Sequence, residues 1–202
     1  MEKEKTKTIN YNFFHWGPFL YKTILMEKEI EDIKKLCSKS NKDYRENLVG
    51  LIKNEHEIES IKLFGILAPY MESYARSLYE HYPPTVPLGN KIELKQAWVN
   101  YMIKGEANSI HTHDHDLSFV LFTQVPKDLK KEYNETISKS KPGTINFVYN
   151  LSTKKYFINE HSFFPSVGDL FIFPADLHHY VNPFKCEGER ISVSGNIKIT
   201  NG

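Results

Sequence analysis

The sequence predicts a mainly β-sheet domain, a sandwich or jelly roll, that is preceded by helices. Several short β-type segments with turn signals between them fill the second half of the chain. Residues 117–125 form a near-continuous apolar run, which is typical of a strand buried on both faces. The first half instead carries apolar residues at helical spacing, so we expect helices to support the sheet.

Length and charge suggest one domain and no general affinity for polyanions. The 202 residues predict a single domain over 1–202, with a strand and supporting helices in 1–90 and the β-sheet core in 91–202. With 26 Lys+Arg and 25 Asp+Glu, the net charge of +1 favours neither nucleic acid nor a membrane as partner. The oligomeric state stays open.

Two further observations favour a cytoplasmic location. The two cysteines, Cys37 and Cys186, are too few for a disulfide framework and fit a reducing compartment. Residues 1–8 lack the apolar core of a secretory signal, and no apolar window is long enough to span a bilayer.

The first half predicts a strand over 19–25 and a helix over 26–38. A longer helix is predicted over 58–82, in which Pro69 either kinks the helix or starts a second one. Its expected apolar stripe is Ile61, Phe64, Leu67, Met71, Tyr74, Leu78 and Tyr82. Residues 39–57 read as a loop or a docking segment.

The second half predicts a long strand over 92–103. Its two expected faces are Ile92, Leu94, Trp98 and Met102 on one side, and Ala97, Val99, Tyr101 and Ile103 on the other. Further strands are expected over 117–125, 144–149, 155–158, 170–173 and 191–199. The polar segment 126–142 reads either as a lid over a site or as a disordered connection.

A histidine cluster, His111-Thr112-His113-Asp114-His115-Asp116, precedes the buried strand. Side chains at i and i+2 of an extended segment point to the same face, so His111 and His113 can bind one metal ion together. His179 follows another buried strand much later in the chain. We expect it to complete the metal site from a separate element.

Arg190 opens the last strand and suggests a second kind of site. Apolar residues after it occupy odd positions, whereas Arg190, Ser192, Ser194 and Asn196 share the other face. A guanidinium on a polar inner face suits bidentate binding of a carboxylate, and Ser192 can add a hydroxyl donor. The alternative is a structural arginine paired with Glu187 or Glu189.

These segments together resemble the iron(II)- and 2-oxoglutarate-dependent dioxygenases, and within them the small oxygenase group related to prolyl hydroxylases. The resemblance covers roughly residues 95–200. It rests on Trp98-Val99-Asn100, Gly105, Asn108, His111-Thr112-His113, Gly168-Asp169-Leu170, Phe173-Pro174, His179, Val181, Pro183 and Arg190-Ile191-Ser192. It implies a cupin-like double-stranded β-helix, a proximal ligand pair, a distal histidine, and an arginine that binds the C5 carboxylate of 2-oxoglutarate.

The chain departs from the family pattern at one ligand. The broad family uses His-x-Asp, which completes a two-histidine, one-carboxylate set. Here His113 occupies the carboxylate position, so it replaces that ligand, or a turn brings in Asp114, or Asp116 pairs with His113 in a shifted register. We favour His111, His113 and His179 as metal ligands.

The remaining residues near these motifs have secondary expected roles. We expect Tyr101 or Asn108 to add hydrogen bonds to the co-substrate. His178 is expected to point outward beside His179, and His115 to lie at the rim of the site.

The resemblance implies iron(II), 2-oxoglutarate and O2 as the reactants. It implies conversion of 2-oxoglutarate to succinate and CO2, with hydroxylation of a C–H bond in a peptidyl or free amino acid such as proline. Two other classes compete with this hypothesis. One is a cupin-like metalloenzyme that does not use 2-oxoglutarate, and the other is a metal-free jelly-roll binding module.

Overall fold

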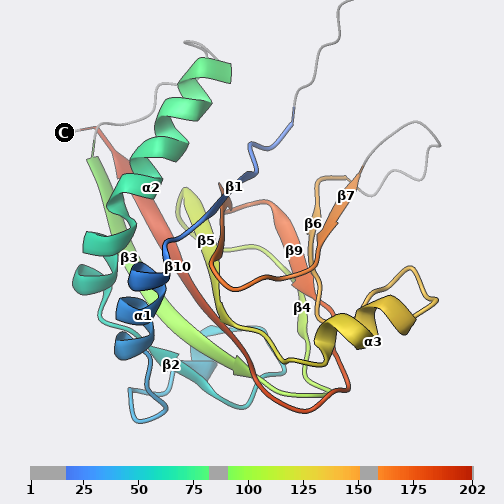
Figure 1. Ribbon diagram of the computed structural model, residues 1–202. Coiled ribbons are helices and arrows are strands. Elements are labelled where there is room, and N and C mark those ends of the chain that lie inside the picture. The colour runs from blue at the N-terminus through green and yellow to red at the C-terminus, as the bar shows by residue number, and fades with distance from the viewer. Residues whose placement is uncertain (1–16, 82–90, 151–158, 202) are drawn as a thin grey trace, which may run out of the picture.

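A computed structural model describes residues 17–81, 91–150 and 159–201. Two antiparallel sheets lie face to face, and helices cover the outer side of the larger one (Figure 1). The larger sheet has the order β1 (Tyr21–Ile24), β8 (Asp169–Pro174), β5 (Leu117–Gln124), β10 (Arg190–Thr200), β3 (Lys91–Met102) and β2 (Glu55–Glu57). The smaller sheet has the order β4 (Asn108–His111), β9 (His178–Val181), β6 (Ile145–Val148) and β7 (Glu160–Phe163).

The chain passes between the two sheets at almost every connection from β3 to β10. Among the described strands from β3 to β10, only β6 and β7 are consecutive strands of the same sheet. This alternation is the double-stranded β-helix arrangement, so the expected mainly β fold with N-terminal helices is confirmed. None of the helices within the described ranges is both long and apolar enough to cross a bilayer.

The two faces of the larger sheet bury different apolar clusters. Helices α1 (Glu27–Leu36) and α2 (Ser60–His81) pack on the outer face, where Ile33, Leu67 and Val193 are fully buried. Phenylalanines fill the space between the sheets: Phe122, Phe147, Phe171, Phe173 and Phe184. The site described below opens from this second cluster.

Helix α2 differs in one respect from the expected stripe. Its buried residues are Leu63, Leu67, Met71 and Tyr74, whereas Ile61 is 82% exposed. Ile61 lies two residues before the fully buried Leu63, about 200° around the helix, so it faces away from the sheet. Pro69 lies inside one continuous helix and does not start another.

The long β3–β10 ladder carries a bulge that reverses the expected alternation of β3. The register passes from Asn196–Gln96 to Ile197–Leu94, so Lys95 is the extra residue. One added residue moves every preceding side chain to the opposite face. Ile92 and Leu94 therefore join Ala97, Val99 and Tyr101 on the helix side, which corrects the expected grouping with Trp98 and Met102.

Two segments expected to be irregular contain regular structure. Residues 39–57 include a short 3-10 turn at Arg45–Asn47 and strand β2. Residues 126–142 include helix α3 (Leu129–Glu135), which is anchored by the fully buried Leu129. The disordered-connection alternative is therefore wrong, and the expected strand over 155–158 lies outside the described residues.

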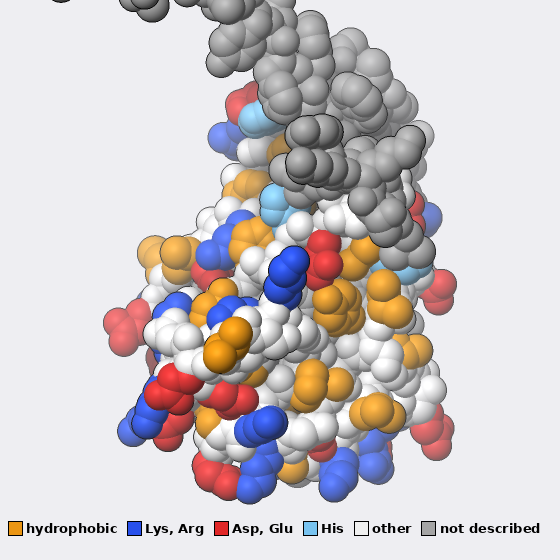
Figure 2. Space-filling view, turned by 90° about the vertical axis from the view of Figure 1, so that its right-hand side faces the viewer, with side chains coloured by type: hydrophobic (Ala, Val, Ile, Leu, Met, Phe, Trp, Pro, Cys, Tyr) orange, Lys and Arg blue, Asp and Glu red, His pale blue; other side chains and the backbone are white. Residues whose placement is uncertain are grey.

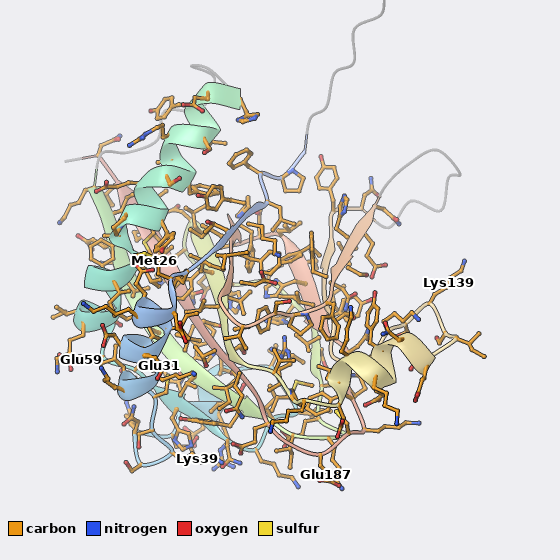
Figure 3. All side chains as sticks on the ribbon, in the orientation of Figure 1. Met26, Glu31, Lys39, Glu59, Lys139 and Glu187 are labelled. Carbon is orange, nitrogen blue, oxygen red and sulfur yellow. The ribbon has the colours of Figure 1, made fainter. Side chains whose placement is uncertain are left out.

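Charges of both signs are mixed on the surface. On the face shown in Figure 2, basic and acidic side chains lie next to each other at the lower end, and hydrophobic side chains are scattered. Lys39, Lys139 and Glu187 project from loops at the edge of the molecule (Figure 3). This face offers no extended surface of one sign.

Candidate functional site

Three histidines from two strands and a turn converge between the sheets. The pairing of β4 with β9 places His111 directly opposite His179. His113 follows β4, and its backbone N–H donates to the Ala175 carbonyl at 2.8 Å. One ligand nitrogen from each of His111, His113 and His179 lies within 4.8 Å of the other two. This group can hold one metal ion.

Backbone carbonyls orient two of the imidazoles. Nδ1 of His111 donates to the Ser109 carbonyl at 2.6 Å, and Nδ1 of His179 donates to the Leu177 carbonyl at 2.9 Å. Each bond fixes the tautomer that leaves Nε2 with a free lone pair. Trp98 packs against the His113 ring, with 5.5 Å between ring centroids.

Burial keeps these imidazoles neutral. It lowers the pKa of His111, lowers that of His113 to about 4, and lowers that of His179 well below the usual value. Neighbouring histidines contribute to the lowered pKa of His113 and His179 after burial, because a second positive charge is unfavourable there. A neutral imidazole is the form that binds a metal ion.

Neither alternative carboxylate joins the histidine group. Asp114 is exposed, and the Asp116 carboxylate accepts the Ile199 N–H at 2.7 Å and pairs with Lys198 at 3.3 Å. Asp116 is thus held against β10. The histidine flanked by these two aspartates, His115, is also exposed and has a left-handed φ of 74°, as a turn residue does.

His178 is exposed and points away from the cluster, as expected for the neighbour of an inward-facing strand residue. His179, next to it, is only 5% exposed. The two adjacent histidines therefore lie on opposite faces of β9.

The histidine group lines a pocket that continues toward the start of β10. The free space inside the pocket is small, about 40 Å³. Trp98, Phe119, Val120 and Phe173 form apolar parts of its wall. No residue of segment 126–142 lines it, so α3 does not act as a lid over this pocket here.

Arg190 lies in the same pocket and has no anionic partner among the residues that the structure describes. Its side chain is 2% exposed, and neither Nε nor Nη2 has a hydrogen-bond partner. Nη1 contacts Met102 Sδ at 3.5 Å, and the guanidinium lies 4.5 Å from the centroid of Phe122. Burial lowers its pKa to about 9, so the group stays charged at neutral pH. A buried charge without a partner is costly, which indicates a site for an anion.

The alternative that Arg190 is a structural residue paired with Glu187 or Glu189 is wrong. Glu187 pairs with Lys104, and Glu189 pairs with Lys39. Both acids lie on the surface and bind lysines there. Arg190 instead turns inward from the same short segment.

Polar side chains surround the arginine on the inner face of the larger sheet. Ser192 and Asn100 both line the pocket, and Asn100 Nδ2 donates to Ser192 Oγ at 3.4 Å. Asn108 also lines it, and its Oδ1 has no partner. Ser192 and Asn108 are therefore placed where we expected them.

Tyr101 does not reach this pocket. It lies on the helix side of β3, in the cluster with Val99, and its ring is within 5.0 Å of Lys39 Nζ. The expected role of Tyr101 in co-substrate binding is therefore corrected. Its neighbour Asn100 faces the pocket instead, and a polar residue inside an otherwise buried strand was the signal that could have identified it.

The residues present fit both groups that the sequence resemblance implies. Three neutral imidazoles with free lone pairs suit a divalent first-row metal ion. The unpaired Nε and Nη2 of Arg190 are geometrically suited to a carboxylate. Both lie in one pocket, as binding of a single metal-chelating acid requires.

Comparisons with known proteins agree with this geometry. The sequence model of the family described as "Putative 2OG-Fe(II) oxygenase" matches residues 96–196, half of the chain. No curated protein matches the sequence at a significant level.

Several solved structures share the fold. A prolyl-4-hydroxylase from Pseudomonas putida superposes with a TM-score of 0.55 at 14% identity, over 91% of this chain and 92% of that one. A viral collagen prolyl hydroxylase from Paramecium bursaria Chlorella virus-1, in complex with 2-oxoglutarate, gives 0.52 at 14%, over 88% and 94%. HygX from Streptomyces hygroscopicus, with nickel and 2-oxoglutarate bound, gives 0.53 at 11%, over 90% and 81%. At these identities, the similarity is one of fold.

Proposed function

The chain belongs to the 2OG-Fe(II) oxygenase family, and from this premise we propose that it hydroxylates a C–H bond of a free or peptidyl amino acid such as proline. The enzyme class brings iron(II), 2-oxoglutarate and O2 as reactants. Together they supply oxidative decarboxylation of 2-oxoglutarate to succinate and CO2, coupled to transfer of one oxygen atom to the substrate.

In this proposal His111, His113 and His179 would hold the iron, with Nε2 as the free nitrogen of His111 and His179. The carbonyls of Ser109 and Leu177 keep two of the rings in the required tautomer. The third imidazole replaces the carboxylate of the broad family pattern, so the ligand set carries no charge.

Arg190 holds the distal carboxylate of 2-oxoglutarate, and this buried guanidinium is the observation that carries the proposal. Its Nε and Nη2 have no other partner, so the acid gains two charge-assisted hydrogen bonds. Ser192 lies two residues along the same face and adds a hydroxyl donor. Asn108 lines the pocket and is available for a further hydrogen bond.

The apolar wall excludes water around the reacting groups. Phe173 packs against His179 with ring centroids 4.9 Å apart, and Trp98 supports His113. Leu48 and Val49 also line the pocket, and Val49 is 58% exposed. An apolar amino-acid side chain such as the proline ring suits such a rim. The shared fold with prolyl hydroxylases supports the same substrate class.

The experiment joins a binding step to a product analysis. Anaerobic, iron-loaded protein is titrated with 2-oxoglutarate by calorimetry, and we expect a micromolar Kd, about −8 kcal/mol. Succinate formation is then measured with free proline and with proline-containing peptides, and mass spectrometry identifies the product that has gained oxygen from isotopically labelled O2.

Each competing class gives a different result. Metal binding without 2-oxoglutarate binding would favour a cupin-like metalloenzyme, and binding of neither would favour a metal-free module. Succinate formation that no amino acid or peptide stimulates would refute the proposed substrate class.

A further inference from the structure

Glu55 has a buried carboxyl group next to the pocket. The proposed mechanism does not use this carboxyl group. Glu55 is 1% exposed, and within the described part of the chain neither of its carboxyl oxygens has a hydrogen-bond partner. Glu55 lies in β2, opposite Asn100 in β3. Asn100 in turn lies opposite Ser192 in β10. These three residues form one row across neighbouring strands, and their side chains share one face of the sheet.

The row contains a hydrogen-bonding mismatch. Asn100 Nδ2 donates to Ser192 Oγ at 3.4 Å, which leaves Asn100 Oδ1 buried and without a partner. The Glu55 oxygens, which are acceptors when ionised, are also unpaired. Glu55 and Asn100 are directly opposed in the ladder, and such side chains have Cβ atoms about 5 Å apart, so the two groups are neighbours. A neutral carboxylic acid would satisfy both Glu55 and Asn100.

We propose that Glu55 is a positioning residue: as a neutral acid it donates to Asn100 Oδ1, and Asn100 then directs the Ser192 hydroxyl toward the carboxylate held by Arg190. This inference rests on the proposed function, because it takes 2-oxoglutarate as the ligand of Arg190. Since Asn100 Nδ2 donates to Ser192 Oγ, the hydroxyl proton of Ser192 remains free to bind the ligand.

Loss of the proton from Glu55 reverses the direction of the hydrogen bonds along this row. A carboxylate only accepts, so the Asn100 amide gains by turning its Nδ2 toward Glu55 and its Oδ1 toward Ser192. The Ser192 hydroxyl then donates to Asn100 and presents lone pairs to the ligand. The carboxylate of 2-oxoglutarate loses one donor and meets an acceptor instead.

The surroundings of Glu55 favour its neutral form near neutral pH. The pKa of Glu55 is raised to about 7, mainly by burial and next by the Glu106 carboxylate; Arg45 lowers it and Asp43 raises it by smaller amounts. Glu106 accepts the backbone N–H groups of Lys53 and Ile103, at 3.1 and 3.0 Å.

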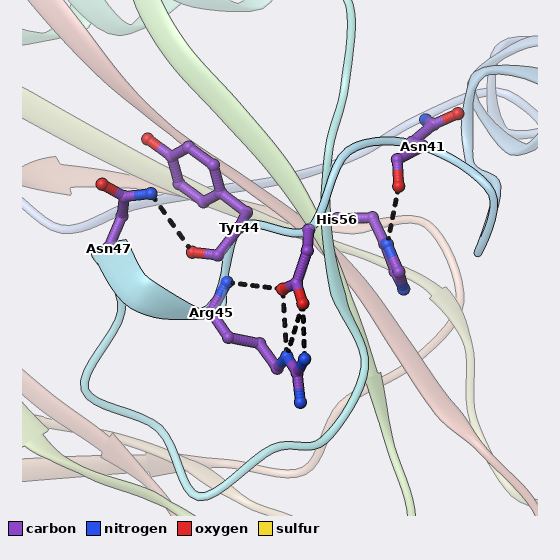
Figure 4. Close-up of polar contacts among 6 residues, drawn as sticks. Asn41, Tyr44, Arg45, Asn47 and His56 are labelled. Carbon is purple, nitrogen blue, oxygen red and sulfur yellow. Dashed lines mark hydrogen bonds and ion pairs between the residues drawn. The ribbon is translucent and has the colours of Figure 1, made fainter.

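Arg45, the cation that lowers the pKa of Glu55, is already paired. Arg45 binds Asp43, and on the other face of β2 the Nδ1 of His56 hydrogen-bonds to the Asn41 carbonyl at 3.0 Å (Figure 4). Since Arg45 is paired with Asp43, its effect on Glu55 is partly offset.

The test is the pH dependence of 2-oxoglutarate binding to the iron-loaded, anaerobic protein, measured by calorimetry. For the wild type we expect about ten-fold weaker binding at about pH 8 than at about pH 6, because a hydrogen bond to a charged group is lost. Glu55→Gln keeps an N–H donor toward Asn100 at every pH, so we expect tight binding that does not change over this range. The matched control is Glu57→Gln on the same strand, where Glu57 is exposed, and it should behave as the wild type.

Ser192→Ala provides a second variant that removes the end of the row without altering Glu55. We expect weak binding of 2-oxoglutarate at both pH values, without the decrease between about pH 6 and about pH 8 that the wild type should show. The inference is overturned if the wild type binds equally at both pH values, or if Glu55→Gln or Ser192→Ala retains the wild-type dependence. Wild-type protein that binds no 2-oxoglutarate at either pH would overturn the proposed function together with this inference, whereas pH-independent binding overturns the inference alone.

Discussion

The two ends of the pocket differ in how completely the protein satisfies its own polar groups. At the histidine end, carbonyls of β4 and of the turn before β9 accept the ring N–H groups of His111 and His179. At the other end, two nitrogens of the Arg190 guanidinium have no partner. The fold thus prepares the metal ligands in advance, whereas the anion site is complete only when an anion is bound.

This contrast has an energetic basis. Neutral imidazoles that donate to nearby carbonyls can be buried at little cost. A buried guanidinium without a counter-charge costs several kcal/mol, which the packing of the sheet must offset. Folding alone therefore satisfies the polar groups at the metal end, whereas the guanidinium at the arginine end is satisfied only when a ligand binds.

Removal of a histidine ligand should have the largest effect. We expect His179→Ala to lower iron affinity and succinate formation by more than about 100-fold, because loss of a ligand exceeds the effect of losing a supporting residue. Metal content after loading and succinate formation are the measurements. His178→Ala is the matched control, since that side chain is exposed, and equal losses in both variants would refute the assignment.

Replacement of Arg190 should weaken binding at the anion end of the pocket and leave the metal end unchanged. We expect Arg190→Met to bind iron as the wild type does and to bind 2-oxoglutarate about 100-fold more weakly, because a buried charge pair can no longer form. Anaerobic calorimetric titration of the metal-free protein with iron(II), and then of the iron-loaded protein with 2-oxoglutarate, measures the two affinities. Unchanged 2-oxoglutarate binding would place its carboxylate elsewhere.

Acid should destabilise the metal-free protein through the histidine end. The pKa of His113 is lowered to about 4 in the folded protein, so between the normal histidine pKa and this value only the unfolded chain takes up its proton. Stability therefore falls as pH decreases through this window, by about 2 kcal/mol at pH 5 from His113 alone. Denaturant unfolding at several pH values tests this, and His113→Asn should show a shallower decline.

The smallest expected effect concerns the stability of the ligand-free protein. Arg190→Met removes a buried charge without a partner, so the free energy of unfolding should rise by about 1 kcal/mol despite the loss of function. Urea unfolding of the metal-free proteins provides the comparison. A clear loss of stability would show that Arg190 has a structural partner after all.

Strand patterns predicted the arginine end well. The alternation of β10 correctly assigned Ser192 and Ser194 to the pocket side and Val193 to the helix side. The histidine spacing predicted a cluster, and the structure brings its members together. These inferences needed only a regular backbone between the residues compared.

Irregular and very short elements limited the rest. The bulge at Lys95 reverses one half of β3, and hydrophobicity alone did not reveal it because both faces of that strand are largely apolar. Strand β2 has three residues, all charged or polar, so no periodic pattern marked it or the buried Glu55. Tyr101 was assigned to the pocket because its face could not be fixed without the register of the sheet.

Strand β4 has a mechanical consequence for the metal. It is an edge strand that pairs with β9 alone, and its ladder is interrupted between Asn108 and His111. An ion held by His111, His113 and His179 would therefore serve as a non-covalent cross-link that ties a loosely held edge to the interior. Loading the metal should then slow hydrogen exchange at the amides of β4 more than at those of the central strands, so that the cofactor completes the tertiary structure as well as the chemistry.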